Sequence, residues 1–212
     1  MINLSSLDIT NKNIVIRVDM NVPIEDGNVL DSTRIKACIP TINYALNADS
    51  KILLISHLGR PIENNFEEKF SLKPVALSLS KLINESVEII DDLDSKDIFK
   101  GSSNIQMLEN IRFFKGEKEN CKELGQKLGS LGDLYVFDAF GTAHREQAST
   151  QSAIEKSNNA CAGILLEKEN EFLSKALNNF ESPYVAIIGG AKVSTKLELI
   201  EHINSVADYV VV

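Results

Sequence analysis

The stretch KILLISHLGRP (residues 51–61) joins an apolar, β-prone run to a histidine, a glycine, an arginine and a proline. A short apolar run of this kind predicts a buried strand, and the polar residues that follow it predict a loop. Similar runs occur along the chain, at residues 14–18, 87–90, 105–108, 134–137, 184–188 and 209–212. We expect each run to form a strand that is apolar on both faces.

Helical periods separate most of these runs. Apolar residues recur at spacings of three or four within residues 35–46, 75–82, 124–131 and 197–203, as they do on the buried face of a helix. Pro40 lies inside the first period, and we expect it to bend that helix. Helices that alternate with doubly buried strands predict an α/β fold, with a doubly wound, mostly parallel sheet and helices on both faces.

Composition and charge narrow the class of protein. The chain has 212 residues, of which 43% are hydrophobic, and a net charge of -8 at pH 7. An acidic surface repels nucleic acid and anionic membranes, so we expect neither as a partner. Three widely spaced cysteines predict no disulfide framework and no metal site. With no signal-peptide pattern and no membrane-spanning run, we expect a cytoplasmic protein.

The arginines are placed where an anion could bind. The chain has five: Arg17, Arg34, Arg60, Arg112 and Arg145. All but Arg17 lie beyond the carboxyl ends of predicted strands, which is the edge of an open α/β sheet where ligands bind. A guanidinium group matches the oxygens of carboxylate and phosphate two at a time, so we expect recognition of a small, multiply charged anion. For any one arginine, a surface ion pair is the alternative.

Three polar residues accompany these arginines. His57 could act beside the same anion as a neutral donor or as a cation, and we assign it no proton transfer. Asp19 and Asn21 follow the first predicted strand, where short polar side chains suit either a turn or recognition of a hydroxyl group.

A second group occurs in IIGGAKVSTKLELI, which begins at residue 187. Gly189 and Gly190 lie between a predicted strand and a helix, and Lys192 and Lys196 follow. Backbone N–H groups at a helix start attract phosphate, although a plain strand-to-helix turn would also explain the glycines. The motif is neither a P-loop nor a GxGxxG fingerprint, which argues against a dinucleotide-dependent oxidoreductase.

Six motifs in one order resemble the phosphoglycerate kinases over nearly the whole chain: RVDMNVP, DSTRI, SHLGRP, LENIRFFKGE, DAFGTAHR and GGAKVSTK. The resemblance implies a two-lobed glycolytic kinase that transfers a phosphoryl group between 1,3-bisphosphoglycerate or 3-phosphoglycerate and ADP or ATP. It implies a substrate-binding lobe at residues 1–164 and an interdomain helix and hinge at 165–183. Residues 184–212 would begin a nucleotide-binding lobe, a partial second α/β domain.

The resemblance further implies a truncated enzyme. Such a chain would bind 3-phosphoglycerate without turnover by itself. The ligands of the Mg²⁺ that accompanies ATP or ADP would lie in the missing C-terminal part, and we expect a monomer. A stand-alone anion-binding module without catalysis is the alternative.

The resemblance also implies residue roles. Arg34 and Lys192 would be catalytic, with Arg34 beside the carboxyl group and Lys192 stabilising the transferred phosphoryl group. The substrate-binding residues would be Asp19, Asn21, Arg34, His57, Leu58, Gly59, Arg60, Arg112 and Arg145. The nucleotide-binding residues would be Gly189, Gly190, Lys192 and Lys196. Met20 and Phe137 depart from the usual family residues without removing a ligand, although Phe137 could alter how the following loop is braced.

Overall fold

The computed structural model describes residues 2–95, 98–178, 180–189 and 197–211. The chain forms two compact units, Met1–Glu167 and Lys168–Val212, and the division falls inside helix α5 (Ile164–Asn178). The sequence places the end of the first domain slightly earlier, at residue 164. The assignment of the domains to substrate and nucleotide stays a prediction.

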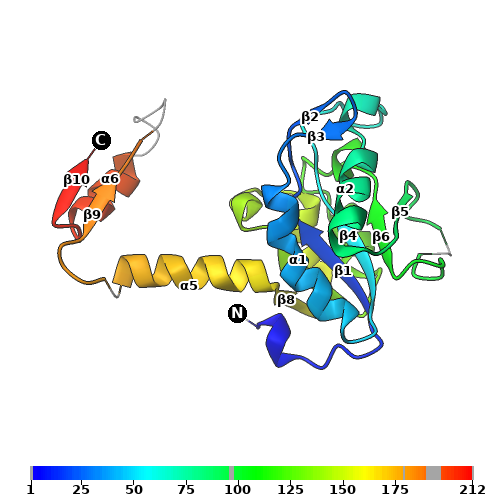
Figure 1. Cartoon of the computed structure of the whole chain (residues 1–212), viewed down its shortest axis with the longest axis horizontal. Coiled ribbons are helices and arrows are strands. Elements are labelled where there is room, and N and C mark those ends of the chain that lie inside the picture. Colours follow the sequence, from blue (N-terminus) through cyan, green and yellow to red (C-terminus); the bar gives the residue numbers. More distant parts are fainter. Residues whose placement is uncertain (1, 96–97, 179, 190–196, 212) are drawn as a thin grey trace. The chain divides into compact units, whose positions relative to one another are not determined.

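The first unit is built on a six-stranded sheet with the order β5-β6-β4-β1-β7-β8 (Figure 1). The strands are β1 (Asn13–Val18), β4 (Lys51–Ile55), β5 (Val87–Ile90), β6 (Ile105–Leu108), β7 (Leu134–Asp138) and β8 (Ala160–Ala162). All neighbouring strands pair in parallel. From β1 the chain winds first to one edge and then to the other, which confirms the doubly wound α/β prediction.

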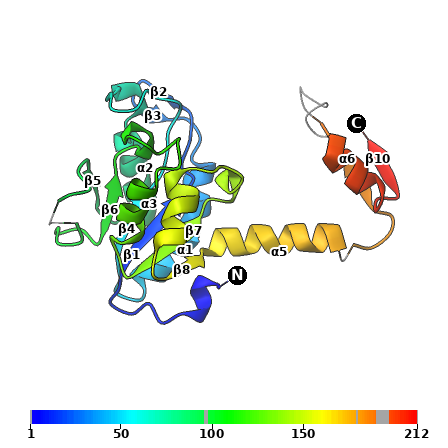
Figure 2. The ribbon, with the colours of Figure 1, turned by 180° about the vertical axis from the view of Figure 1, so that it is seen from behind.

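Helices cover both faces of this sheet (Figures 1 and 2). They are α1 (Thr33–Leu46), α2 (Lys73–Ile83), α3 (Lys122–Gly129) and α4 (Ala153–Lys156). Ile14 and Ile16 of β1 belong to one core cluster with residues of α1 and α2. Val15 belongs to a second cluster with residues of α3 and α4. Successive residues of β1 therefore face opposite cores, as its apolar sequence requires.

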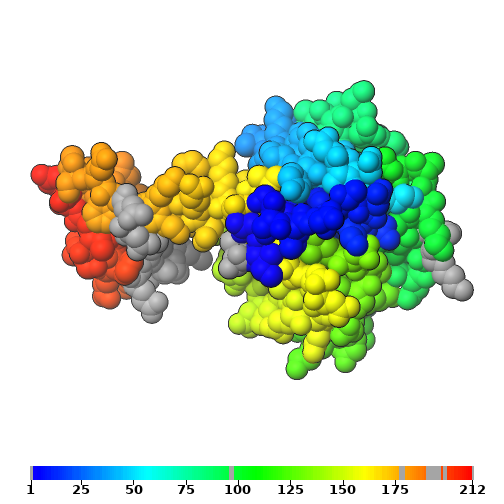
Figure 3. Space-filling view, turned by 90° about the horizontal axis from the view of Figure 1, so that it is seen from below, coloured from blue at the N-terminus to red at the C-terminus, as the bar shows by residue number. Residues whose placement is uncertain are grey.

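Two strand pairings were not predicted. Strands β2 (Ile24–Glu25) and β3 (Asn28–Val29) form a small antiparallel hairpin. Strand β8 is the edge of the main sheet, and its Ala162 N–H donates to the Ile2 carbonyl at 2.8 Å. Figure 3 shows the N-terminal segment, in blue, lying against the yellow part of the chain that contains β8.

A buried carboxylate of β7 holds the first turn of α5. Asp138 is fully buried and accepts hydrogen bonds from the Leu166 N–H at 2.9 Å and the Thr41 hydroxyl at 2.6 Å. The Thr41 hydroxyl in turn accepts from the Ile164 N–H at 3.1 Å. Gly163 lies so close that an added Cβ would be 2.3 Å from the Asp138 carboxyl carbon. Residues of α1 and β7 therefore fix the start of α5.

The predicted helices are present. Helix α1 continues through Pro40, and the bend expected there stays a prediction. The second unit contains the rest of α5, strands β9 (Val185–Ile187) and β10 (Tyr209–Val211), and helix α6 (Leu197–Asn204). Strands β9 and β10 pair in parallel. Ile187 and Tyr209 are 79% and 64% exposed, whereas Ala186 in the middle of β9 is buried.

Candidate anion-binding site

A sharp loop follows β4 and carries His57. A buried amide, that of Asn110, holds this loop because it accepts from the Leu58 N–H at 3.2 Å and donates to the Leu58 carbonyl at 2.7 Å. The Leu58 side chain packs in the core. Gly59 has φ +58, and an added Cβ would lie 2.3 Å from the Phe70 ring. The loop therefore requires glycine at this position, for conformation and for space.

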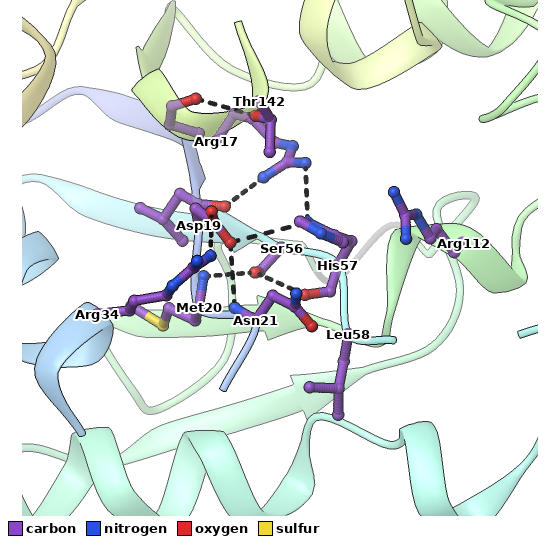
Figure 4. Close-up of polar contacts among 12 residues, drawn as sticks. Arg17, Asp19, Met20, Asn21, Arg34, Ser56, His57, Leu58, Arg112 and Thr142 are labelled. Atoms are coloured by element: carbon purple, nitrogen blue, oxygen red, sulfur yellow. Dashed lines mark hydrogen bonds and ion pairs between the residues drawn. The ribbon is translucent and has the colours of Figure 1, made fainter. Parts of the chain in front are cut away.

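The end of β1 supplies Asp19 and Asn21 (Figure 4). The Asp19 carboxylate accepts a hydrogen bond from Arg34 Nη1 at 2.6 Å. The Asn21 N–H donates to Asp19 at 3.2 Å, and the Asn21 side-chain oxygen accepts from the Gly59 N–H at 2.9 Å. Asn21 thus links the end of β1 to the loop after β4. The Arg34 side chain remains 55% exposed.

His57 is a buried, neutral histidine. Its Nδ1 lies 3.4 Å from Arg17 Nη2 and 4.0 Å from the Asp19 carboxylate. Burial, followed by nearby positive charge, lowers the pKa of His57 from 6.5 to about 2. The cations that contribute are Arg17, Arg112, Arg145 and Arg34. At neutral pH the His57 ring is therefore uncharged.

Arg112 and Arg145 each keep one donor that no group of the described residues uses. Within the described part of the chain, their buried Nε atoms have no hydrogen-bond partner. Arg112 Nη1 donates to the Gly59 carbonyl. Burial is the main cause that lowers the pKa of Arg112, and the nearby Arg145, Arg17 and Arg60 lower it further. Buried donors without partners indicate that the site can accept an oxygen-rich ligand.

Arg17 is a site residue that the sequence analysis did not assign. It lies in β1, is completely buried, and donates from Nε to the Ser149 hydroxyl at 2.9 Å. The Ser149 hydroxyl donates to the buried Glu117 carboxylate at 2.7 Å. The sequence offered one indication of a special role for Arg17: it is a charged residue inside the apolar run IVIRV, and a buried cation needs specific partners.

The two departures from the family pattern are core residues. Met20 is fully buried and packs between the sheet and α1 and α2. Phe137 is 7% exposed and packs with Ala139, Ala162 and Leu166, beside the start of α5. Neither side chain occupies the place of a predicted ligand-binding residue.

The predicted nucleotide-binding residues belong to the second unit. Gly189 follows β9, and among the described residues other than its chain neighbours no atom lies within 4 Å of an added Cβ. Gly190, Lys192 and Lys196 lie outside the described residues. Among residues that are described, no group of three or more His, Cys, Asp or Glu is arranged to bind a metal ion. The described helices include none that is both long and apolar enough to cross a membrane.

Comparisons with known proteins agree with this architecture. A family model described as phosphoglycerate kinase matches residues 4–212. A phosphoglycerate kinase of Desulfovibrio desulfuricans is 46% identical over 99% of this chain and 53% of its own length.

Solved structures show the same similarity. The structure of phosphoglycerate kinase from Coxiella burnetii has a TM-score of 0.89 and 43% identity, with 98% of this chain and 53% of that one covered. For the Pyrococcus horikoshii enzyme the TM-score is 0.86 and the identity 33%, with 99% and 54% covered. This chain spans about half the length of the curated relatives it matches. Since sequence and structure agree over almost all of its residues, the chain belongs to the phosphoglycerate kinase family.

Proposed function

We propose that this chain provides the 3-phosphoglycerate site of a glycolytic kinase. That enzyme transfers a phosphoryl group between 1,3-bisphosphoglycerate or 3-phosphoglycerate and ADP or ATP. The proposal rests mainly on the group of arginines at the carboxyl edge of the sheet. Among the described residues, the Nε donors of Arg112 and Arg145 have no hydrogen-bond partner. Family membership supports the reaction, and the site supports the class of ligand.

The charge balance favours a phosphate over internal ion pairs. Across the described residues, Arg34 is the arginine that forms an ion pair with a carboxylate, that of Asp19. Burial, followed by repulsion from neighbouring arginines, disfavours the charge on Arg112 and lowers its pKa. A dianion bound among these groups would offset both effects through charge-assisted hydrogen bonds.

We assign different parts of the 3-phosphoglycerate molecule to different groups of residues. His57, Arg60, Arg112 and Arg145 would hold the phosphate, on a loop shaped by Leu58 and Gly59. Asp19 and Asn21 would contact the hydroxyl and carboxyl region of the glycerate. Arg34, paired with Asp19 and half exposed, would lie beside the carboxyl group and the phosphoryl group in transfer. Positioning and fixed positive charge would then supply most of the catalysis.

The nucleotide side of the proposal rests on the motif after β9. Gly189, Gly190, Lys192 and Lys196 would bind nucleotide phosphates, and Lys192 would stabilise the transferred group. No step is assigned to a metal held by this chain, because its described residues offer no matching ligand cluster. The Mg²⁺ that accompanies ATP or ADP would be bound elsewhere in the enzyme, which we propose to be a cytoplasmic monomer.

The domain limits proposed for this division are residues 1–164 for substrate binding, 165–183 for the interdomain helix and hinge, and 184–212 for the start of the nucleotide lobe. The unit that contains Asp19 to Arg145 is compact and has its own core, which supports binding of 3-phosphoglycerate by this chain.

Calorimetric titration with 3-phosphoglycerate tests the site. Arg60→Lys keeps the charge but loses the two-pronged donor geometry, so the affinity should fall about tenfold. Lys81→Arg is the matched control, because Lys81 is an exposed residue in the last turn of α2. Equal affinities of wild type and Arg60→Lys would contradict the arginine-fork assignment.

A coupled assay with ATP, Mg²⁺ and 3-phosphoglycerate separates the kinase from the alternative anion-binding module. We expect no turnover by this chain alone, and turnover after addition of a separately produced remainder of a family member. Binding without any turnover in the mixture would favour the module. Robust turnover by this chain alone would contradict the proposed division between lobes.

A further inference from the structure

We propose that Glu117 and Ser149 are positioning residues that act through Arg17 to hold His57 in the tautomer protonated at Nε2. These four residues form a continuous line of polar contacts that runs from the segment before α3 through β1 to the loop after β4. The tautomer follows from these contacts alone. Its effect on ligand affinity rests additionally on the proposed function.

The line begins at a fixed hydroxyl group. Ser149 donates its hydroxyl proton to Glu117 Oε1 at 2.7 Å, and its N–H donates to Glu117 Oε2 at 2.9 Å. The Tyr135 hydroxyl donates to the Ser149 carbonyl at 2.6 Å. Glu117 and Ser149 are completely buried. Because the one hydroxyl proton of Ser149 points to Glu117, its oxygen lone pairs are left to accept from Arg17.

Arg17 passes this orientation on to His57 (Figure 4). Its Nε donates to Ser149 at 2.9 Å and its Nη1 donates to the Val18 carbonyl, which leaves Nη2 3.4 Å from His57 Nδ1. A guanidinium group has only donors. His57 Nδ1 must therefore accept, and the ring proton must be on Nε2.

The other charges around His57 do not reverse this assignment. Asp19 could accept a proton from Nδ1, but its carboxylate oxygen is 4.0 Å away, beyond hydrogen-bonding distance. Arg112, Arg145 and Arg34 also act on the ring, and all three are cations. They disfavour a second proton on the ring.

The resulting tautomer suits an anionic ligand. No group in the described part of the chain accepts a hydrogen bond from His57 Nε2. Its N–H is therefore available to a ligand oxygen, and a neutral donor can assist the arginines without adding to their repulsion. In the opposite tautomer the Nε2 lone pair would face the anion and repel it.

Long-range ¹H–¹⁵N correlation spectra of the ¹⁵N-labelled chain report the tautomer directly. The chain has only three histidines, and His57→Gln identifies the signals of His57. In the wild type we expect Nδ1 to resonate as an unprotonated nitrogen and Nε2 as a protonated one. A protonated Nδ1 would overturn the proposal without any mutant.

Ser149→Ala removes the bridge between Glu117 and Arg17. We expect a mixture of His57 tautomers and an affinity for 3-phosphoglycerate lower by about two- to tenfold, the worth of one hydrogen bond. Ser152→Ala is the matched control, because Ser152 is a buried serine of the same π-helical segment, η5 (Ala148–Ser152), bonded to Asn120 at 2.7 Å. It should leave both readouts unchanged.

The outcomes separate this inference from the proposed function. An unchanged tautomer in Ser149→Ala would overturn the positioning role, even if affinity fell. A wild type that shows the expected tautomer but does not bind 3-phosphoglycerate would contradict the proposed function and leave the tautomer assignment supported.

Discussion

Arg17 and Arg34, whose charges both act on His57, lie in different environments. Arg17 is completely buried and is linked to the Glu117 carboxylate through the Ser149 hydroxyl. Arg34 is 55% exposed and contacts the Asp19 carboxylate directly at 2.6 Å. The direct contact has the shorter distance between charges, but solvent screens it. The bridged contact is longer, but lies in a medium where an unpaired charge is costly.

This difference indicates which of the two arginines could exchange its protein partner for a ligand. Burial is the main cause that raises the pKa of Glu117, although Arg17 and the bonds from Ser149 lower it, so this carboxylate depends on all its partners. The buried group must stay complete and is therefore suited to a fixed role. Arg34 can exchange Asp19 for a ligand oxygen at little cost in stability, which suits a group that meets substrate.

The largest effect is expected on breaking the buried contact between Arg17 and Glu117 that Ser149 bridges. Glu117→Gln keeps the side-chain shape but removes the carboxylate charge near Arg17, so the free energy of unfolding should fall by about 3 kcal/mol. Urea denaturation measures this change. Glu119→Gln, at an exposed position two residues along, is the control and should change little. A loss below about 1 kcal/mol for Glu117→Gln would show that burial does not make the contact of Arg17 with Glu117 more important for stability than that of Arg34 with Asp19.

An intermediate effect concerns His57, whose pKa both arginines lower in addition to the larger effect of burial. The unfolded chain protonates this histidine below about pH 6.5, whereas the folded chain keeps it neutral down to about pH 2. Because the unfolded state binds more protons in this window, the free energy of unfolding should fall as pH drops, by up to about 1.4 kcal/mol per pH unit.

Comparison with His57→Gln isolates the contribution of His57 to the pH dependence of stability. Glu117 and Asp138 have raised pKa values, so each alone would increase stability as pH falls, but both residues are present in both proteins. In urea denaturation, the free energy of unfolding of the wild type should therefore fall relative to that of His57→Gln as the pH drops from about 7 to about 5. A constant difference would mean that His57 takes up a proton normally in the folded chain.

The smallest effect is expected at the exposed pair. Arg34→Met should change the free energy of unfolding by no more than about 0.5 kcal/mol, since exposed ion pairs contribute little. Urea denaturation of wild type and variant in low salt and in high salt measures this change, which should be nearly the same at both salt concentrations. A loss comparable to that of Glu117→Gln would remove the distinction between the two arginines.

The sequence predicted the fold well where the apolar pattern was continuous. The strand runs at residues 14–18, 51–56 and 134–137 match β1, β4 and β7 closely, because a strand covered on both faces is apolar at every position. Strand β8 was missed because its three residues, Ala-Cys-Ala, are too short and small for a periodic signal. The hairpin of β2 and β3 was missed for the same reason of length.

The site could be predicted in part. The positions of the arginines that follow strands could be read from the strand pattern, and Arg145 and Arg60 are near enough to Arg112 to help burial lower its pKa. Arg17 was not assigned because sequence shows no partner for a charge inside a strand. Ser149 and Glu117 lie 132 and 100 positions away from it, and only the fold makes them neighbours. The binding and catalytic roles stay predictions.

The carboxylate at the start of α5 limits what evolution can change nearby. A Cβ added at Gly163 would lie 2.3 Å from the carboxyl carbon of Asp138, so even alanine at position 163 would collide with this side chain. Asp138 cannot retreat without releasing Thr41 and Leu166 together. Three positions far apart in the gene are thus coupled: a side chain at position 163 becomes tolerable only alongside compensating changes in β7 and α1.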